Sequence, residues 1–478
     1  MLPSCGHHAA LMLKIVRESK GFFIAATIAA IALRLVFIFR FPSVTTDSFI
    51  YGDIAKNWLQ HGVYGLSSAG EVVPTYIRLP GYPAFLAAIF AIFGIDHYRA
   101  ALIVQMFVDL GTCFLIANLA RRVVAENASK AAFLLAALCP FLANYAAAAL
   151  TESLEIFFTT LALNFAVAGL ESADAGTVGP WMGCGFATAA AMLLRPDGGI
   201  LLVALELFLA WQIIQMRRKK TQAVYFLRAA VVVGLFSIAP LIPWTLRNLH
   251  TMHRFQPLAP RYANEENEFV PMGFNRWIKT WIIDYASVEE VYWQVPGQQV
   301  DPEKLPDRAF DSPLQRQETL QTIDAYNSAL HVSPEIDAEF GKLASERVRH
   351  SPFRYYLCLP ALRIADMWLR PRTEMLPSDT RWWEFNDEPK WSVLAVGLGI
   401  IGIFYVAAAL VGLVLGKVRG KARGTFNHLD LLLTFVVVRS LFLGSLENPE
   451  PRYMLECYPV VIVLAAAAFQ RKLRNRAA

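Results

Sequence analysis

Charged residues are scarce in this chain of 478 amino acids. Asp, Glu, Lys and Arg together make up 17% of the sequence, whereas hydrophobic residues make up 55%. Soluble domains are about one quarter charged, so this is not the composition of a typical soluble domain. It is typical of a chain that crosses a membrane several times.

Patterns that bind metals or nucleic acids are also lacking. The six cysteines include no Cys-x-x-Cys pair, which argues against a zinc site and against a disulfide framework. The histidines show no His-x-x-x-His spacing, and no clear third ligand follows His250 and His253. Basic clusters are short and lie between apolar runs, so we expect no nucleic-acid partner. We expect neither a metal nor another cofactor.

Long apolar runs, in contrast, are abundant. A membrane span needs about 20 apolar residues at a rise of about 1.5 Å each. The run 83–94 is too short for this, and we expect it and the amphipathic segment 351–371 to lie at the membrane interface. The candidate spans lie near residues 21–41, 100–120, 131–149, 153–170, 180–194, 198–215, 227–246, 391–416, 430–446 and 453–469.

Lysine and arginine predict how these spans are oriented, because cytoplasmic loops are enriched in both. With ten spans, all the basic clusters fall on one side, which we assign to the cytoplasm together with both termini. The first run is too long for the apolar region of a signal peptide and lacks a small-x-small cleavage site, so we expect it to be retained. The clusters lie within residues 14–20, 121–130, 217–220, 417–423 and 471–476.

The predicted fold is an all-α, polytopic membrane bundle of about ten spans, in three parts. Residues 1–246 form an N-terminal membrane module whose first outer loop, 42–99, holds interfacial helices. Residues 247–390 are polar and contain over half of the Asp and Glu, which predicts an extracytoplasmic cap with mixed short helices and loops. Residues 391–478 hold the last spans and a basic cytoplasmic tail.

Two acids stand where spans reach the outer face. Asp47 lies about six residues beyond the first run, and a carboxylate there is suited to act as a general base on an acceptor hydroxyl. The alternative is that Asp47 caps a helix over 48–60. Glu152 lies in LTESLE, between two apolar runs, where ionisable groups facing a cavity tend to be functional. Its alternative role is also a helix cap, which Thr151 or Ser153 would serve equally well.

Four arginines fall on the same predicted outer face, although arginine and lysine are usually enriched in cytoplasmic loops. A guanidinium matches phosphate oxygens in a bidentate way and stays charged, so these residues suggest an anionic ligand. The alternative is that they anchor to lipid headgroups. Arg34 differs, because it lies inside the first span and needs a partner there. The outer-face arginines are Arg78, Arg195, Arg247 and Arg452.

The sequence resembles the GT-C superfamily of polytopic glycosyltransferases, in the bacterial branch of protein O-mannosyltransferases, aminoarabinose transferases and Rgt-like transferases. The motifs that carry the resemblance are TTDSFIYGDIAKNWLQHGVYG, RLPGYPAFLAAIFAIFG, LTESLE, LLRPDGG, PWTLRN and PRYMLECYP. Several relatives have two adjacent acids in the first outer loop, but here Ser48 follows Asp47, so we predict no metal dependence.

The resemblance implies an enzyme in the bacterial inner membrane with an extracytoplasmic active site. Its donor is expected to be a polyprenyl-phosphate sugar, and its acceptor a hydroxyl of a glycan, lipid or protein, with inversion. Membrane lipid is a further expected partner. The expected catalytic residues are Asp47 and Glu152; the expected donor-phosphate contacts are Arg78, Arg452, Arg247 and Arg195; other expected substrate contacts are Tyr51, Tyr82 and Tyr453.

Other functions remain open on the sequence alone. A transporter or flippase of a lipid-linked saccharide is the main alternative. Transporters usually show paired repeats and broken mid-membrane helices, and the sequence shows neither. A polysaccharide ligase or polymerase with a similar donor, and a membrane scaffold with a sensory cap, are the others.

Overall fold

The computed structural model describes residues 3–265, 267–385, 388–421 and 426–469. Almost all regular structure in this part of the chain is helical, which confirms the predicted all-α class. The chain forms two compact units. The first unit contains residues 1–265, 404–438 and 455–478, and the second unit contains residues 266–403 and 439–454. The predicted three-part division stays a prediction.

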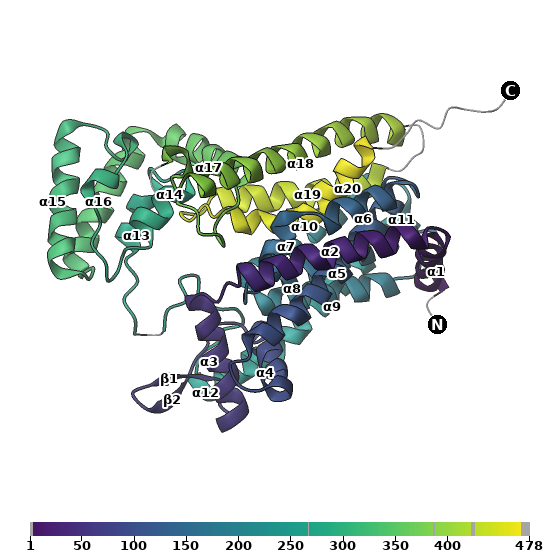
Figure 1. The fold of residues 1–478 in the computed structure, drawn as a ribbon, viewed down its shortest axis with the longest axis horizontal. Coiled ribbons are helices and arrows are strands. Elements are labelled where there is room, and N and C mark those ends of the chain that lie inside the picture. The colour runs from purple at the N-terminus through teal and green to yellow at the C-terminus, as the bar shows by residue number, and fades with distance from the viewer. Residues whose placement is uncertain (1–2, 266, 386–387, 422–425, 470–478) are drawn as a thin grey trace. The chain divides into compact units, whose positions relative to one another are not determined.

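The first unit is built from long apolar helices, of which α2 (Lys20–Arg40), α5 (Tyr98–Val123) and α8 (Glu152–Glu171) lie side by side (Figure 1). Residues of α18 (Pro389–Lys421) and α19 (Phe426–Gly444) belong to both units. The helices that lie wholly in the first unit, apart from the first outer loop, are α1 (Pro3–Glu18), α2 (Lys20–Arg40), α5 (Tyr98–Val123), α6 (Ala128–Ala137), α7 (Pro140–Ala146), α8 (Glu152–Glu171), α9 (Gly179–Leu194), α10 (Gly199–Gln215), α11 (Lys220–Ile238), α12 (Ile242–Met252) and α20 (Tyr458–Ala468).

Seven of the described helices are long and apolar enough to cross a membrane, and an eighth span is added if the bent pair α6 and α7 is one span. The protein is therefore an integral membrane protein. Each predicted span coincides with a helix or with two consecutive helices, including the shorter α9. The number ten itself stays a prediction. The basic cluster at 471–476 and the side chains of 417–423 lie outside the described residues.

The predicted first outer loop, residues 42–99, contains α3 (Thr46–His61), a two-stranded antiparallel hairpin and α4 (Gly81–Phe93). Both helices were expected from the sequence. The hairpin of β1 (Gly65–Ser68) and β2 (Glu71–Pro74) was not. It is fixed to α3 by Asp53, whose carboxylate accepts hydrogen bonds from the backbone N–H and the hydroxyl of Ser67 at 2.7 and 2.8 Å.

Arg34 has the buried partner that its position in the first span requires. Its Nε lies 2.5 Å from Oδ2 of Asp109 in α5, and both side chains are almost fully buried. The guanidinium also donates to the carbonyl oxygens of Ala137, at 2.6 Å, and Ala30, at 3.1 Å. A buried guanidinium needs both charge compensation and satisfied donors. This contact joins α2, α5 and the end of α6.

The second unit has its own hydrophobic core, formed around Trp277, Trp281 and Phe340. In the predicted interfacial segment 351–371, a π-helical turn over Arg354–Cys358 leads into α17 (Leu359–Leu369). The apolar side chains of Phe353, Leu357 and Leu362 are exposed, as expected for a membrane-facing helix. The other helices of this unit are α13 (Met272–Lys279), α14 (Tyr285–Ser287), α15 (Pro313–Ala329), α16 (Pro334–His350) and α17 (Leu359–Leu369).

Candidate functional site

Asp47 forms an ion pair with Arg78 between the first span and α4. Its Oδ1 accepts a hydrogen bond from Nη2 of Arg78 at 2.8 Å. Asp47 does not cap the helix, because the N-cap of α3 is Thr45, which forms a capping box with Ser48. The Asp47 side chain is 38% exposed and that of Arg78 is 17% exposed. The structure therefore presents an accessible carboxylate that is held by a largely buried guanidinium.

Arg247 supports the backbone that carries Arg78. Its Nη1 donates to the carbonyl oxygen of Thr75 at 2.7 Å, and its Nη2 donates to that of Tyr64 at 2.6 Å. The Tyr64 hydroxyl in turn donates to the carbonyl oxygen of Arg78 at 3.0 Å. The guanidinium of Arg247 also lies 5.3 Å from the ring centroid of Trp244. Through these contacts Arg247 holds the backbone between the hairpin and α4 in place.

Glu152 and Arg195 form a second ion pair. Nη1 of Arg195 lies 3.0 Å from Oε1 of Glu152, and its Nε lies 3.0 Å from Oδ1 of Asp197. The N-cap position of α8 is occupied by Thr151, so Glu152 is not the cap residue and instead opens the first turn. Its side chain is only 5% exposed. Glu152 is thus placed to orient Arg195 rather than to face open solvent.

Two backbone contacts bring these ion pairs to the same end of the first unit. Ser43, just after α2, donates to the carbonyl oxygen of Ala147 and accepts from the N–H of Ala149, each at 2.9 Å. Gly81, at the start of α4, packs against the end of α9, because a Cβ there would lie 2.6 Å from the carbonyl oxygen of Leu193. A larger residue at Gly81 would push α4 away from the turn that carries Arg195.

Tyr51 lies between the two ion pairs. The guanidinium of Arg78 stands 5.7 Å from its ring centroid, and the Tyr82 ring packs edge-on at 5.0 Å. Burial raises the pKa of Tyr51 to about 12. The positive charges of Arg78 and Arg195 partly offset this increase, whereas the negative charges of Asp47 and Glu152 add to it. The Tyr51 hydroxyl is therefore neutral at pH 7. The Tyr82 hydroxyl donates to Oε1 of Gln105 at 2.6 Å.

Arg452 and Tyr453 belong to the second unit, where both contact Glu450. Nε of Arg452 lies 2.5 Å from Oε2 of Glu450, and the Tyr453 hydroxyl donates to Oε1 at 2.6 Å. The Arg452 guanidinium also lies 5.3 Å from the Tyr453 ring centroid. The predicted roles of Arg452 and Tyr453 in substrate binding stay predictions. Glu450, which orients both side chains, was not singled out in the sequence.

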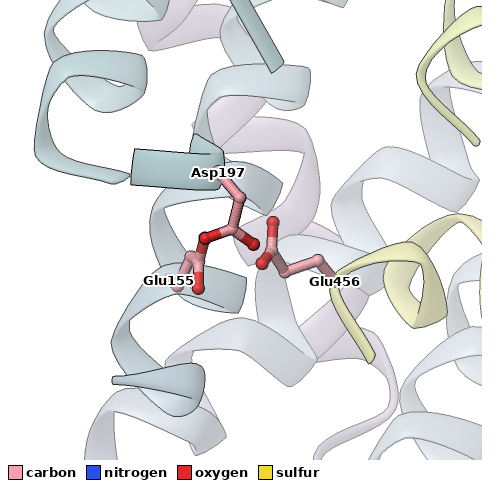
Figure 2. Close-up of side chains that lie close together, drawn as sticks. All are labelled: Glu155, Asp197 and Glu456. Atoms are coloured by element: carbon pink, nitrogen blue, oxygen red, sulfur yellow. The ribbon is translucent and has the colours of Figure 1, made fainter. Parts of the chain in front are cut away.

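A group of three carboxylates was also missed. Glu155, Asp197 and Glu456 offer oxygen atoms that all lie within 4.8 Å of one another (Figure 2). Glu155 follows Glu152 by three residues, which places both on one face of a helix. That spacing and the proximity of Asp197 to Arg195 were visible in the sequence. The position of Glu456 beside them was not, because it comes from a segment about 260 residues further on.

Residues 74–244 match the family described as dolichyl-phosphate-mannose-protein mannosyltransferase. This match confirms the predicted resemblance to GT-C glycosyltransferases, and it includes Arg78, Glu152 and Arg195. A comparison with curated proteins gave no match.

Among solved structures, the chain is similar to ArnT from Cupriavidus metallidurans bound to undecaprenyl phosphate. The identity is 13% and the TM-score 0.41, and the match covers 94% of this chain and 77% of ArnT. It is also similar to the oligosaccharyltransferase AglB from Archaeoglobus fulgidus in complex with an inhibitory peptide and a dolichol-phosphate. That match has 12% identity and a TM-score of 0.47, and covers 96% of this chain but only 50% of AglB.

Proposed function

We propose that this protein is a membrane glycosyltransferase that moves a sugar from a polyprenyl-phosphate donor to an acceptor hydroxyl. The observation that carries the proposal is the ion pair of Asp47 and Arg78, which sets a carboxylate and a guanidinium side by side at the end of the first span. The family match over residues 74–244 supports the donor class, because dolichyl phosphate is a polyprenyl-type lipid phosphate.

The reaction needs one base and one group that stabilises the leaving phosphate. The acceptor oxygen forms a bond to the anomeric carbon while the bond from that carbon to the phosphate oxygen breaks. The electron pair leaves with the phosphate, and the hydroxyl proton passes to Asp47. The guanidinium of Arg78 stabilises the charge that develops on the phosphate. A single displacement of this kind inverts the anomeric configuration.

Accessibility favours Asp47 over Glu152 as the base. The Asp47 side chain is 38% exposed, whereas that of Glu152 is 5% exposed and is paired with Arg195. A base must reach the hydroxyl it deprotonates. We therefore assign proton transfer to Asp47, and assign to Glu152 the positioning of Arg195, which contacts the donor phosphate.

The remaining predicted residues take supporting roles in this proposal. Arg247 holds the Arg78 segment through Thr75 and Tyr64 rather than contacting phosphate directly. Tyr51 and Tyr82 form the buried wall behind the reactive groups. Arg452 and Tyr453 lie in the second unit, and their expected roles in substrate binding stay predictions from the sequence. We place the site on the extracytoplasmic face of a bacterial inner membrane, because the basic clusters predict the opposite face to be cytoplasmic.

The test is incubation of the purified protein with a panel of radiolabelled polyprenyl-phosphate sugars, followed by separation of sugar, lipid phosphate and glycosylated acceptor. We expect release of the lipid phosphate with at least one sugar, and loss of release in Asp47→Asn. A transporter would leave the bond between sugar and phosphate intact.

Asp96→Asn is the matched control for this experiment. Asp96 is exposed in the same outer loop and has a positive φ of 60°, which asparagine also tolerates. We expect full activity in this variant. Full activity in Asp47→Asn as well would remove Asp47 from the catalytic role.

A further inference from the structure

Three segments that are distant in the sequence place carboxylates against one another inside the first unit. Glu155 comes from the first turn of α8, Asp197 from the short helix over Pro196–Gly198, and Glu456 from the helical turns over Pro451–Cys457 that precede α20 (Figure 2). Each of the three lies near the start of a candidate membrane span. Their oxygens all lie within 4.8 Å of one another.

Like charges at this spacing repel strongly where the surroundings are shielded from water. Nε of Arg195 lies 3.0 Å from Oδ1 of Asp197 and 3.4 Å from Oε2 of Glu155. This guanidinium carries a single positive charge, and its Nη1 is also paired with Glu152. Arg195 contacts the carboxylates of Glu152, Glu155 and Asp197, and its single positive charge cannot neutralise all three.

Glu155 gives the second and independent observation. Its side chain is fully buried, no hydrogen bond of normal geometry reaches either carboxylate oxygen in the described part of the chain, and the polar groups beside it are Arg195 and the carboxyl of Glu456. Figure 2 shows this carboxylate next to that of Asp197, with the carboxylate of Glu456 reaching towards them from another segment. A buried carboxylate without hydrogen bonds is costly unless a cation compensates it. The ion pair with Arg195 at 3.4 Å reaches only Oε2.

We propose that Glu155, Asp197 and Glu456 bind one divalent metal ion. Carboxylate oxygens are hard ligands, so the donor set selects Mg²⁺, Mn²⁺ or Ca²⁺ over metals that prefer sulfur or imidazole. Oxygen ligands lie about 2.1 Å from Mg²⁺ and about 2.4 Å from Ca²⁺, so opposite ligands of one ion are about 4–5 Å apart. The separation limit of 4.8 Å among these oxygens is compatible with a single ion.

Such an ion would have a structural effect next to the proposed active site. It would tie the start of α8 to the turn between α9 and α10 and to the start of α20. Arg195 contacts both Glu152 and Asp197, so the ion would also fix the guanidinium that we assign to the donor phosphate. The site was not expected from the sequence, because its three ligands lie far apart in the chain. Asp197 and Glu456, unlike Glu155, have no second acid within three residues in the sequence that would have drawn attention to them.

The test measures binding of Mn²⁺ to the full-length protein in detergent, after treatment with EDTA, by electron paramagnetic resonance. We expect saturable binding of one ion per chain in the absence of any sugar donor. Glu155→Gln keeps the size of the side chain but removes its charge. It should raise the Kd at least about tenfold, because one of three charged ligands is lost. No saturable binding, or the same Kd in Glu155→Gln, would overturn the proposal.

Glu171→Gln is the matched control, because Glu171 lies at the opposite end of α8 and pairs with Arg122 instead. Its Kd for Mn²⁺ should equal that of the wild type. Asp197→Asn and Glu456→Gln serve if Glu155→Gln does not fold, and each should weaken binding to a similar degree. If the carboxylates share protons instead, Mn²⁺ does not bind in stoichiometric amounts, and the proposal fails. This measurement contains no transfer step, so its outcome is independent of the proposed glycosyl transfer.

Discussion

Asp47 and Arg78 lie 31 residues apart in the chain, yet their side chains meet at 2.8 Å. The pair joins the first turn of α3 to the segment that precedes α4. Arg78 therefore has two tasks in the proposed reaction: it orients the base, and it faces the departing phosphate.

Replacement of Arg78 should weaken donor binding more than acceptor binding. A charge-assisted hydrogen bond contributes about 1.5–3 kcal/mol, so Arg78→Ala should raise the KM for the donor by roughly tenfold to a hundredfold. Arg78→Lys should recover part of this, because the charge remains but the bidentate geometry is lost. Separate titration of donor and acceptor measures the two effects. Arg99→Ala, at an exposed arginine at the end of the same loop, is the control. An effect confined to the acceptor would contradict the assignment.

The buried pair of Arg34 and Asp109 should be essential for stability in the membrane. Asp109→Asn leaves a buried guanidinium without its counter-charge, and breaking a buried pair in this way costs about 3–5 kcal/mol. We expect a marked fall in the temperature of thermal unfolding in detergent. The double variant Arg34→Met with Asp109→Leu should lose less than Asp109→Asn alone, because no charge remains buried. If the double variant is less stable than Asp109→Asn, the pair contributes more to stability than charge compensation.

Asp311 should make the second unit sensitive to acid. Burial by itself would raise the pKa of Asp311, but the hydrogen bond from Arg354 and the charges of Arg347 and Arg354 lower it below its ordinary value. An acid whose pKa is lowered by folding stabilises the protein above its unfolded pKa of about 4, and this stabilisation is lost as the pH falls through the folded pKa.

Hydrogen exchange of peptides from α15 and α16 in the full-length protein measures this effect. Protection should fall as the pH drops below about 4, the unfolded pKa of an aspartate. Asp311→Asn should lower protection at pH 7, because Arg347 is buried and lies 3.1 Å from Oδ1 of Asp311. Lowering the pH should reduce the hydrogen-exchange protection of Asp311→Asn only slightly further. An acid response as steep as that of the wild type would assign the effect to another group.

Glu374 should have the opposite pH dependence. Burial raises the pKa of this carboxyl to about 7, although a backbone hydrogen bond and the charge of Arg372 partly offset the effect. An acid whose pKa is raised by folding favours the folded state while it is protonated. Its contribution to the free energy of unfolding is therefore most favourable below the unfolded pKa of about 4.3, and is lost as the pH rises through about 7.

Glu374→Gln should consequently stabilise the protein at pH 8 by about 1–3 kcal/mol, and should have little effect at pH 4. Thermal unfolding in detergent at the two pH values measures the difference. Glu384→Gln is a control, because Glu384 lies nearby in the sequence but pairs with Arg381 near the surface. Equal effects of Glu374→Gln at both pH values would contradict the raised pKa.

Local features of the sequence account for most of the helices. The apolar runs recur at the length of a span, and each coincides with helical structure, because hydrogen bonds within a helix and burial of apolar side chains are both decided over short stretches. The start of α3 was placed within a few residues, although the capping residue is Thr45 and not Asp47. The hairpin was missed because its strands are only four residues long.

The sequence by itself determined that the chain is a helical membrane protein, and which acids and arginines end its spans. Only the tertiary structure decided which of these charges meet. Arg34 pairs with Asp109 across 75 residues, Arg195 with Glu152 across 43, and Glu456 joins Glu155 and Asp197 from the far end of the chain. Such contacts depend on how the helices pack, because a side chain finds its partner in space and no local pattern records the distance between helix ends.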